Sequence, residues 1–326
     1  MRQALRRATW EAPGVTAETA ERRAVLIAGP TASGKSALAL AVAERCGGVV
    51  INADSMQVYR ELRILTARPS PEDEARAPHR LYGHVGSGDG YTVARYLDDL
   101  EGVLKETAGR PAVIVGGTGL YFNAMTQGLS DVPPIDERVR AFWRERARTT
   151  SPAALHRELA VVDPVLYGRL HPNDTQRVLR ALEVADSTGR PLSEWQEKRS
   201  RPPISGGRIA RVVMAPARDW LHDRIDERFR AMAAGGGLDE ARAFSALGLD
   251  PALPAMKAIG VPDMMAAARG EVAVEEAIEA AVTATRQYAK RQETWFRNQM
   301  ADWPRLDPAA ARHFVAVADD IAQRMK

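Results

Sequence analysis

The segment of residues 24–36 constrains this chain more than any other, because it joins a short apolar strand to a complete phosphate-binding loop. The letters AVLIA run into GPTASGKS, a full match to the pattern G-x-x-x-x-G-K-[ST], and an Ala- and Leu-rich helical segment follows. The glycines of such a loop let successive backbone N–H groups converge with the N-terminus of the next helix on phosphate oxygens. The pattern therefore predicts that a di- or triphosphate binds to Gly29, Pro30, Thr31, Ala32, Ser33, Gly34, Lys35 and Ser36.

Two side chains of the loop carry chemistry of their own. Lys35 adds a positive charge beside the terminal phosphates, and the Ser36 hydroxyl is placed to ligate Mg²⁺, the one cofactor that the sequence indicates. The alternative is a glycine-rich turn without a phosphate, which the strand before it and the helix after it disfavour. The loop does not say whether the bound phosphate is attacked or only held.

Alternating strand and helix signals predict a parallel α/β sheet over residues 22–128. Strands are expected in AVLIAG, GGVVINAD and RPAVIVGG, with helices around 37–45 and 93–107. Amphipathic helices without a convincing strand follow, and the apolar segment 208–216 then returns to the sheet before a helical C-terminus. We therefore expect a P-loop NTPase-like core, residues 22–128 and 206–326, with a helical insertion, residues 129–205, and a flexible tail, residues 1–21.

Composition narrows the class of protein only a little. Of the 326 residues, 45% are hydrophobic and 27% are charged, and the net charge of +3 is compatible with a polyanionic partner without identifying one. The single cysteine, Cys46, excludes an internal disulfide and fits a reducing compartment. No apolar run approaches the roughly 20 residues that span a bilayer. We expect a cytoplasmic protein with no membrane partner, and we take it to be a monomer.

Polar residues follow two of the expected strands. Asp54 comes after VVINA and Thr118 after AVIVGG, and ligands of open parallel sheets bind outside the carboxyl ends of the strands. Both residues are therefore candidates to face the phosphate loop. The alternative for Asp54 is a turn or helix-capping carboxylate, and the alternative for Thr118 is a simple turn. If AVIVGG lies beside the loop, the acid that holds Mg²⁺ in ATP- and GTP-hydrolysing proteins is missing there.

Several motifs follow one another along residues 23–300: GPTASGKS, NADSMQVYR, TARP, GGTGLYF, HPNDTQRVLRALEV and TRQYAKRQETWFRNQ. In their order and spacing they resemble the tRNA dimethylallyltransferases, the isopentenyl transferases that modify the adenosine next to the anticodon. The resemblance implies that dimethylallyl diphosphate is the prenyl donor and that N6 of adenosine 37 in the tRNA anticodon stem-loop is the acceptor.

The resemblance also implies catalytic roles. Asp54 matches the family's general base, Thr118 its GGT threonine near the bridging oxygen or the amine, and Arg218 a second cation beside Lys35 on the diphosphate. The helical insertion would clamp the anticodon loop, with Asn173 and Gln176 at a capping-box spacing. The residues expected to bind tRNA are Asp54, Ser55, Met56, Gln57, Thr118, Gln176, Arg177, Val178, Leu179, Arg180, Lys257 and Gly260.

Two departures from the family's pattern and two rival functions accompany this prediction. Leu65 precedes the TARP motif where the family has Gly, and Val261-Pro262 follow Gly260 where the family has Tyr. The second departure leaves tRNA contacts over 257–262 open.

A small-molecule kinase is the main alternative function. It would place ATP in the loop and use Asp54 on an acceptor hydroxyl, leaving the basic helices unexplained. A nucleotide-dependent RNA-binding module without chemistry is a third possibility, and it predicts that Asp54→Asn leaves every measurable activity unchanged.

Overall fold

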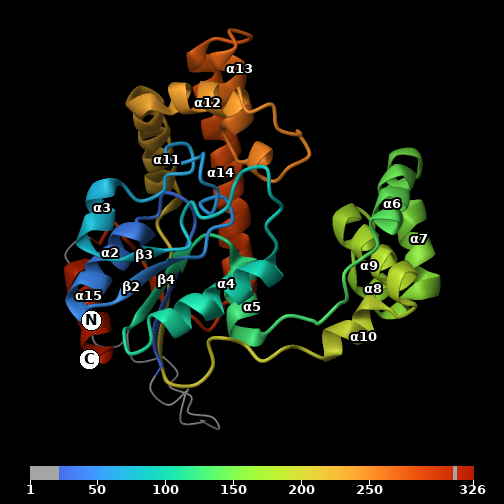
Figure 1. The fold of residues 1–326 in the computed structure, drawn as a ribbon, viewed down its shortest axis with the longest axis horizontal. Helices are drawn as coiled ribbons and strands as arrows, with labels where there is room; N and C mark the ends of the chain where they lie inside the picture. The colour runs from blue at the N-terminus through green and yellow to red at the C-terminus, as the bar shows by residue number, and fades with distance from the viewer. Residues whose placement is uncertain (1–21, 311–313) are drawn as a thin grey trace. The chain divides into compact units, whose positions relative to one another are not determined.

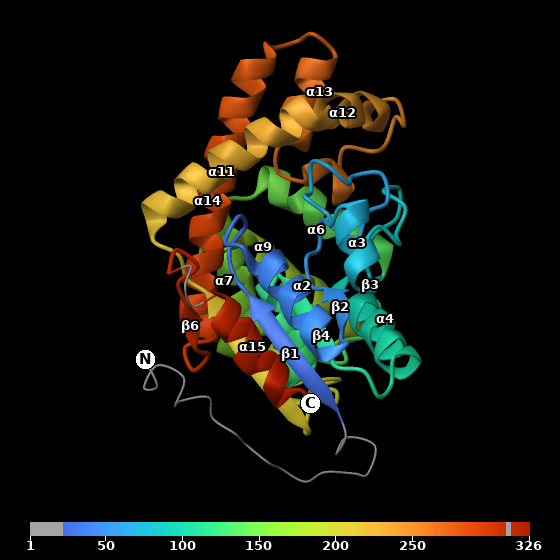
Figure 2. The same cartoon turned by 90° about the vertical axis from the view of Figure 1, so that its left-hand side faces the viewer.

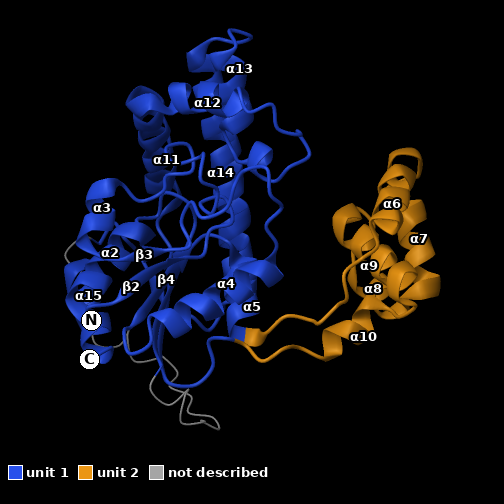
Figure 3. Ribbon diagram, in the orientation of Figure 1, with its two compact units in different colours: residues 1–126, 203–326 blue, residues 127–202 orange. Residues whose placement is uncertain are grey.

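The computed structural model describes residues 22–310 and 314–326 and divides the chain into two compact units, coloured separately in Figure 3. Unit 1 is formed by the chain up to Thr126 and from Pro203 onward, and unit 2 by Gln127–Pro202. The sequence placed the helical insertion at 129–205. The tail predicted over 1–21 lies outside the described residues.

A six-stranded parallel sheet runs through unit 1 (Figure 1), as the sequence predicted. Its strand order is β3-β2-β4-β1-β5-β6, with every neighbouring pair parallel. Residues 24–28 and 49–52 are buried throughout, which is typical of strands covered on both faces. The strands are β1 (Arg23–Ala28), β2 (Val49–Asn52), β3 (His79–Arg80), β4 (Ala112–Gly116), β5 (Arg208–Met214) and β6 (Arg305–Leu306).

Helices cover both faces of this sheet. Helices α2 and α15 pack on one face (Figure 2), where Val25 and Ile27 of β1 meet Leu38 of α2 and Ile321 of α15. Helices α4 and α5 lie on the other side (Figure 1). The helices wholly or mainly in unit 1 are α2 (Lys35–Cys46), α3 (Pro71–Arg76), α4 (Val93–Glu106), α5 (Gly119–Gln127), α11 (Arg218–Met232), α12 (Leu238–Ser245), α13 (Val261–Ala268), α14 (Val274–Gln299) and α15 (Phe314–Arg324).

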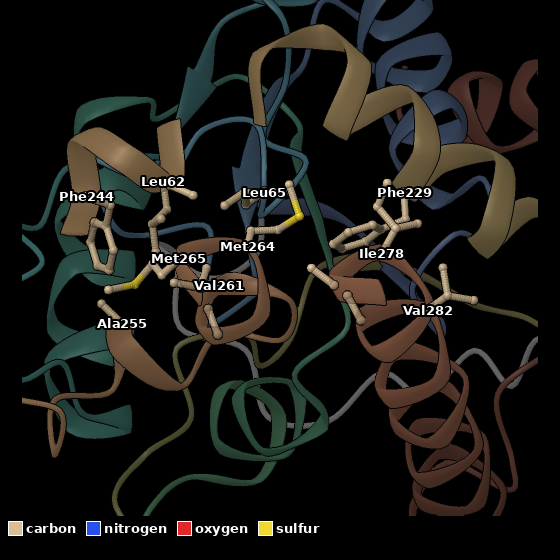
Figure 4. Packing of buried hydrophobic residues seen from close by; sticks show 14 of the residues in the cluster. Leu62, Leu65, Phe229, Phe244, Ala255, Val261, Met264, Met265, Ile278 and Val282 are labelled. Atoms are coloured by element: carbon tan, nitrogen blue, oxygen red, sulfur yellow. The ribbon is translucent and has the colours of Figure 1, made fainter. Parts of the chain in front are cut away.

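A second hydrophobic core of unit 1 lies among α11–α14 (Figure 4). Leu62 and Leu65, from the segment after β2, pack there with Phe229, Met264 and Ile278. A π-helical turn, η1 (Ala233–Gly237), joins α11 to α12, and a 3₁₀ turn, η2 (Ala255–Lys257), precedes α13. This core holds α11 and α14 in place, and both helices contribute side chains to the phosphate loop.

Unit 2 is a helical body with a core of its own. Trp143, Leu155, Leu159, Val178 and Leu182 are among its buried residues, and its helices are α6 (Glu137–Thr149), α7 (Pro152–Val162), α8 (Pro164–Arg169), α9 (Thr175–Thr188) and α10 (Leu192–Glu197). No helix in the described parts of either unit is long and apolar enough to cross a membrane.

The prediction of a capping box at the start of α9 is wrong. The helix begins at Thr175, with Asp174 as its N-cap residue and no side-chain hydrogen bond at the cap. Asn173 instead donates its backbone N–H to Nδ1 of His171 at 3.1 Å. The N-cap residue is Asp174, one position after the Asn173 that a capping box with Gln176 requires.

Candidate active site

The phosphate loop has the backbone conformation that an anion site needs. Residues 29–34 connect β1 to α2, and Ala32 and Gly34 both have left-handed φ values, +62° and +83°. The Ser33 N–H donates to the Pro30 carbonyl at 3.3 Å, and α2 begins immediately after Gly34 with no acidic residue in its first turn. The backbone turns at Ala32 and Gly34 and the positive end of the helix dipole therefore favour an anion at the start of α2.

Lys35 is almost completely buried within this loop. Its side chain has 9% of its surface exposed, and Nζ donates to the Pro30 carbonyl oxygen at 3.2 Å. Burial lowers the pKa of Lys35 to about 8, because a charge is costly away from water; the Asp54 charge opposes this and the Arg228 charge adds to it. An anion bound in the loop would therefore favour the charged form of Lys35.

Arg228 is a second cation at the loop, half-buried on α11, and the sequence analysis missed it. Its Nη2 donates to Oγ1 of Thr31, and burial lowers its pKa to about 10, so it remains charged near neutral pH. Arg218, the residue predicted for this role, is the exposed first residue of α11, and the described chain offers it no hydrogen bond or ion pair. The signal for Arg228 was present in the helix periodicity, since Leu221 and Ile225 place position 228 on the buried side of α11.

Asp54 and Thr118 come together at the carboxyl edge of the sheet. Thr118 Oγ1 accepts from the Ser55 N–H at 2.9 Å and donates to Ser55 Oγ at 3.2 Å, which ties the segment after β4 to the one after β2. Asp54 Oδ1 accepts from the Met56 N–H at 2.9 Å, so this oxygen has the turn role that the sequence left open. Asp54 Oδ2 accepts no hydrogen bond from the residues that the structure describes, and it is free for a ligand.

The charge of Asp54 acts on several neighbours in the same region. It raises the pKa of Lys35 and of Arg228 against the effect of their burial. It also adds to burial in raising the pKa values of Tyr82, Tyr121 and Tyr288, so these phenols stay neutral. The carboxylate and the cations of the phosphate loop therefore share one electrostatic environment.

The strands beside the loop lack the acid of a nucleotide hydrolase. Strand β1 pairs with β4 on one side and β5 on the other. Strand β4 is followed by Gly117 and Thr118, and β5 by Ala215 and Pro216. The strand AVIVGG therefore lies beside the loop strand, as the sequence argument required. No carboxylate directly follows β4 or β5. The site lacks the usual arrangement for activating water against a nucleotide phosphate.

The chemistry at Ser36 suits a magnesium ion that shares its ligands with a bound phosphate. The Ser36 side chain is exposed beside a cavity of about 260 Å³, whose walls include Leu40, Val50, Val115 and Tyr82. Within residues 22–310 and 314–326, no three His, Cys, Asp or Glu side chains converge as a metal site. Mg²⁺ typically takes few protein ligands and fills its shell with phosphate oxygens and water, so one hydroxyl beside the loop fits this ion.

The other residues expected at the acceptor side differ in their availability. Gln57 Nε2 donates to the carbonyls of Thr66 and Ala67, at 2.8 and 2.9 Å, so its amide already orders the TARP turn. Lys257 is exposed. Gly260 is buried in a left-handed conformation, φ +84°, and a Cβ there would lie 2.6 Å from Phe229, so its role in this fold is packing.

The expected tRNA-binding residues of unit 2 lie on both faces of α9. Gln176 and Arg177 are exposed, and Arg177 forms an ion pair with Asp174 at 3.0 Å. Arg180 is half-buried, and Leu179 packs partly against the core. Val178 is fully buried, so its side chain packs inside unit 2.

The fold and the loop define a P-loop NTPase-like α/β protein whose phosphate site faces a carboxylate. Two solved structures share this architecture. A tRNA isopentenylpyrophosphate transferase from Bacillus halodurans aligns with a TM-score of 0.65 and 33% identity, over 93% of this chain and 97% of that one. A eukaryotic dimethylallyltransferase acting on tRNA aligns with a TM-score of 0.76 and 26% identity, over 93% of this chain and 80% of that one.

The chain belongs to the IPP transferase family, whose model matches residues 57–299. It is 53% identical to the tRNA dimethylallyltransferase of Methylobacterium nodulans, over 90% of this chain and 98% of the relative. It is 50% identical to that of Rhodopseudomonas palustris, over 92% of this chain and 96% of the relative. The predicted family is therefore confirmed.

Proposed function

We propose that this chain transfers the dimethylallyl group of dimethylallyl diphosphate to N6 of adenosine 37 in tRNA and releases diphosphate. The observation that carries the proposal is the free oxygen of Asp54 in the electrostatic environment of a phosphate loop whose neighbouring strands end without a Mg²⁺-binding acid. Such a site can hold a diphosphate as a leaving group and accept a proton from a nucleophile. The names of the relatives support the same reaction.

The loop stabilises the leaving group. As the bond between C1 of the allyl chain and the diphosphate oxygen breaks, its electron pair moves to that oxygen, and the negative charge there grows. Lys35, Arg228 and backbone N–H groups of the loop would stabilise this charge, and the contacts of both cations with the loop support this role. We assign Arg228 the role first expected of Arg218, because the half-buried Arg228 donates a hydrogen bond to Thr31 of the loop.

Mg²⁺ is the proposed cofactor. The Ser36 hydroxyl would hold it together with diphosphate oxygens, and the ion would supply further neutralisation of the leaving group's charge. The measurement that tests this is diphosphate binding with and without Mg²⁺ in the wild type and in Ser36→Ala. The assignment predicts that Mg²⁺ strengthens binding much less in the variant.

Asp54 acts as the general base. The N6 amine attacks C1 with its electron pair, the new C–N bond forms, and the proton that N6 must lose passes to Asp54 Oδ2, which has no other described donor. Thr118 is held beside Asp54 through Ser55, where it can hydrogen-bond the amine or the bridging oxygen. The prenyl group replaces one proton on N6, and diphosphate carries away the electron pair.

Unit 2 would supply further contacts to the anticodon stem-loop. Arg177 on its exposed helix face is suited to the RNA backbone, since guanidinium groups pair with phosphate. We further propose a cytoplasmic location, because the single cysteine fits a reducing compartment, and we propose a monomeric state. Light scattering at the working concentration would test the oligomeric state.

The transfer itself is tested by mass spectrometry of nucleosides. An unmodified tRNA with adenosine at position 37 is incubated with the protein, Mg²⁺ and dimethylallyl diphosphate, beside an Asp54→Asn control. A C5H8 gain on adenosine that the control loses or greatly slows is the expected result. No gain, with ATP consumed on a small acceptor instead, would favour the kinase.

A further inference from the structure

A buried polar side chain interrupts the apolar stripe of α14. Ala289 and Phe296 are 1% exposed, and Gln292 between them is 5% exposed. A glutamine amide inside a core is unfavourable unless its polar atoms find partners. The partners of Gln292 therefore show what the residue is there to hold.

Gln292 joins the phosphate loop to the turn before Thr118. Its Oε1 accepts from the Thr31 N–H at 2.9 Å, and its Nε2 donates to the Gly117 carbonyl at 2.8 Å. Gly117 has no room for a side chain, because a Cβ there would lie 2.3 Å from Gln292 Nε2 and 3.4 Å from Asp54 Oδ2. The amide thus lies close to the free oxygen of Asp54.

The contacts continue beyond the amide on both sides. Thr31, held through its N–H, accepts from Arg228 through its hydroxyl. On the other side Trp295, one turn along α14, packs against Gly119, where a Cβ would lie 2.2 Å from the indole ring. A continuous chain of hydrogen bonds therefore runs from the turn beside Asp54 through Gln292 to the second cation of the loop.

We propose that Gln292 is a positioning residue that fixes the distance between the diphosphate loop and the turn of Gly117 and Thr118. This inference rests on the proposed function, because the loop would hold the leaving group and the turn would hold the acceptor amine. Each half-site has its own binding groups without Gln292, so the bridge acts on their relative placement. Displacing reacting groups by about 1 Å can cost roughly 100-fold in rate.

A purely structural role makes a different prediction from a positioning role. If Gln292 only satisfied buried hydrogen bonds, its loss would lower stability and leave turnover by the folded protein intact. If it strengthened phosphate binding, affinity for diphosphate would fall in parallel with turnover. A positioning residue lowers kcat while each substrate, measured alone, still binds.

The test uses two variants of Gln292 and a matched control in the full-length protein. Gln292→Met keeps the length of the side chain and removes both hydrogen bonds, whereas Gln292→Glu keeps an acceptor for the Thr31 N–H and removes the donor to Gly117. Gln287→Met is the control, because Gln287 is exposed on the same helix. The measurements are kcat at saturating donor and tRNA, separate dissociation constants for Mg²⁺-diphosphate and for tRNA, thermal unfolding, and amide exchange of the loop peptide containing Thr31.

The expected results separate the bridge from the proposed reaction. Gln292→Met should lower kcat by about 10- to 100-fold and change each dissociation constant by less than about threefold. It should also speed amide exchange of the loop peptide. Gln292→Glu should lower kcat as well, but its loop peptide should exchange at a rate closer to that of the wild type. A folded Gln292→Met protein with wild-type kcat, or with kcat and diphosphate affinity reduced equally, overturns the inference. If neither the wild type nor Gln287→Met transfers a prenyl group, the proposed function is wrong. In that case amide exchange still tests Gln292, because unchanged exchange of the loop peptide in Gln292→Met would show that its hydrogen bonds do not hold the loop.

Discussion

Asp54 raises the pKa of Lys35 against the burial that lowers it to about 8. Lys35 is charged below this pKa and neutral above it, and a charged Lys35 is what attracts a diphosphate. Affinity for Mg²⁺-diphosphate should therefore fall as the pH rises through about 8. Calorimetric titrations between pH 6.5 and 9.5 check this, and a flat profile across the range would contradict it.

Removing the Asp54 charge should move this pH dependence in a known direction. Without the carboxylate, burial and Arg228 alone act on Lys35, and both lower its pKa. In Asp54→Asn the loss of affinity should begin at a lower pH than in the wild type. Diphosphate binding suits this comparison because it does not require turnover, and a midpoint that stays in place would mean that the two charges do not interact.

Arg228 and Arg218 offer a direct comparison of two cations on one helix. Arg228 is half-buried and donates to Thr31, whereas Arg218 is exposed without a described partner. Hydrogen bonds to charged groups contribute about 1.5–3 kcal/mol, so Arg228→Met should weaken diphosphate binding by roughly 10- to 100-fold. Arg218→Met should change it by less than about twofold, and the reverse order would restore the role that the sequence assigned to Arg218. Thermal unfolding of both variants controls for loss of the fold.

Thr118 should matter for the orientation of the Asp54 segment as well as for the substrate. Thr118→Val keeps the shape of the side chain but leaves the Ser55 N–H without its acceptor. This hydrogen bond is half-buried, and such a bond contributes about 0.5–1.5 kcal/mol, so urea unfolding should show a loss of that order together with reduced transfer. Thr118→Ser should recover most of both, and a fully active Thr118→Val would remove Thr118 from the site.

Gly117 should tolerate no side chain, because the space beside it is already filled. A methyl group there would lie 2.3 Å from the Gln292 amide nitrogen, so Gly117→Ala must displace the amide or the turn. We expect it to reduce kcat as Gln292→Met does, and combining the two should cost less than the product of the single effects, because they break the same bond. Fully multiplicative effects would show that the two residues act independently.

The fold and the centre of the site were predictable from the sequence because their signals are local. The strand, loop and helix around GPTASGKS are contiguous, and the carboxyl ends of parallel strands meet at one edge, which brings Asp54 and Thr118 together. Arg228 and Gln292 could not be placed in the same way, since they reach the loop from helices that follow it by nearly two hundred residues or more. Helix periodicity marks both as polar residues on a buried side, but it does not name their partners.

Neighbouring residues on α9 should have opposite phenotypes. Val178 is fully buried in the core of unit 2, while Arg177 is exposed beside Asp174. Val178→Ala should destabilise unit 2 by about 1–3 kcal/mol, because core truncations lose both transfer and packing energy.

Arg177→Ala should leave stability within about 0.5 kcal/mol. If the guanidinium of Arg177 contacts a phosphate, the variant should also reduce the slope of tRNA affinity against salt concentration, on logarithmic scales, by about 1. An unchanged slope would show that Arg177 does not contact the RNA backbone, and Arg190→Ala on the same unit serves as a second arginine for comparison.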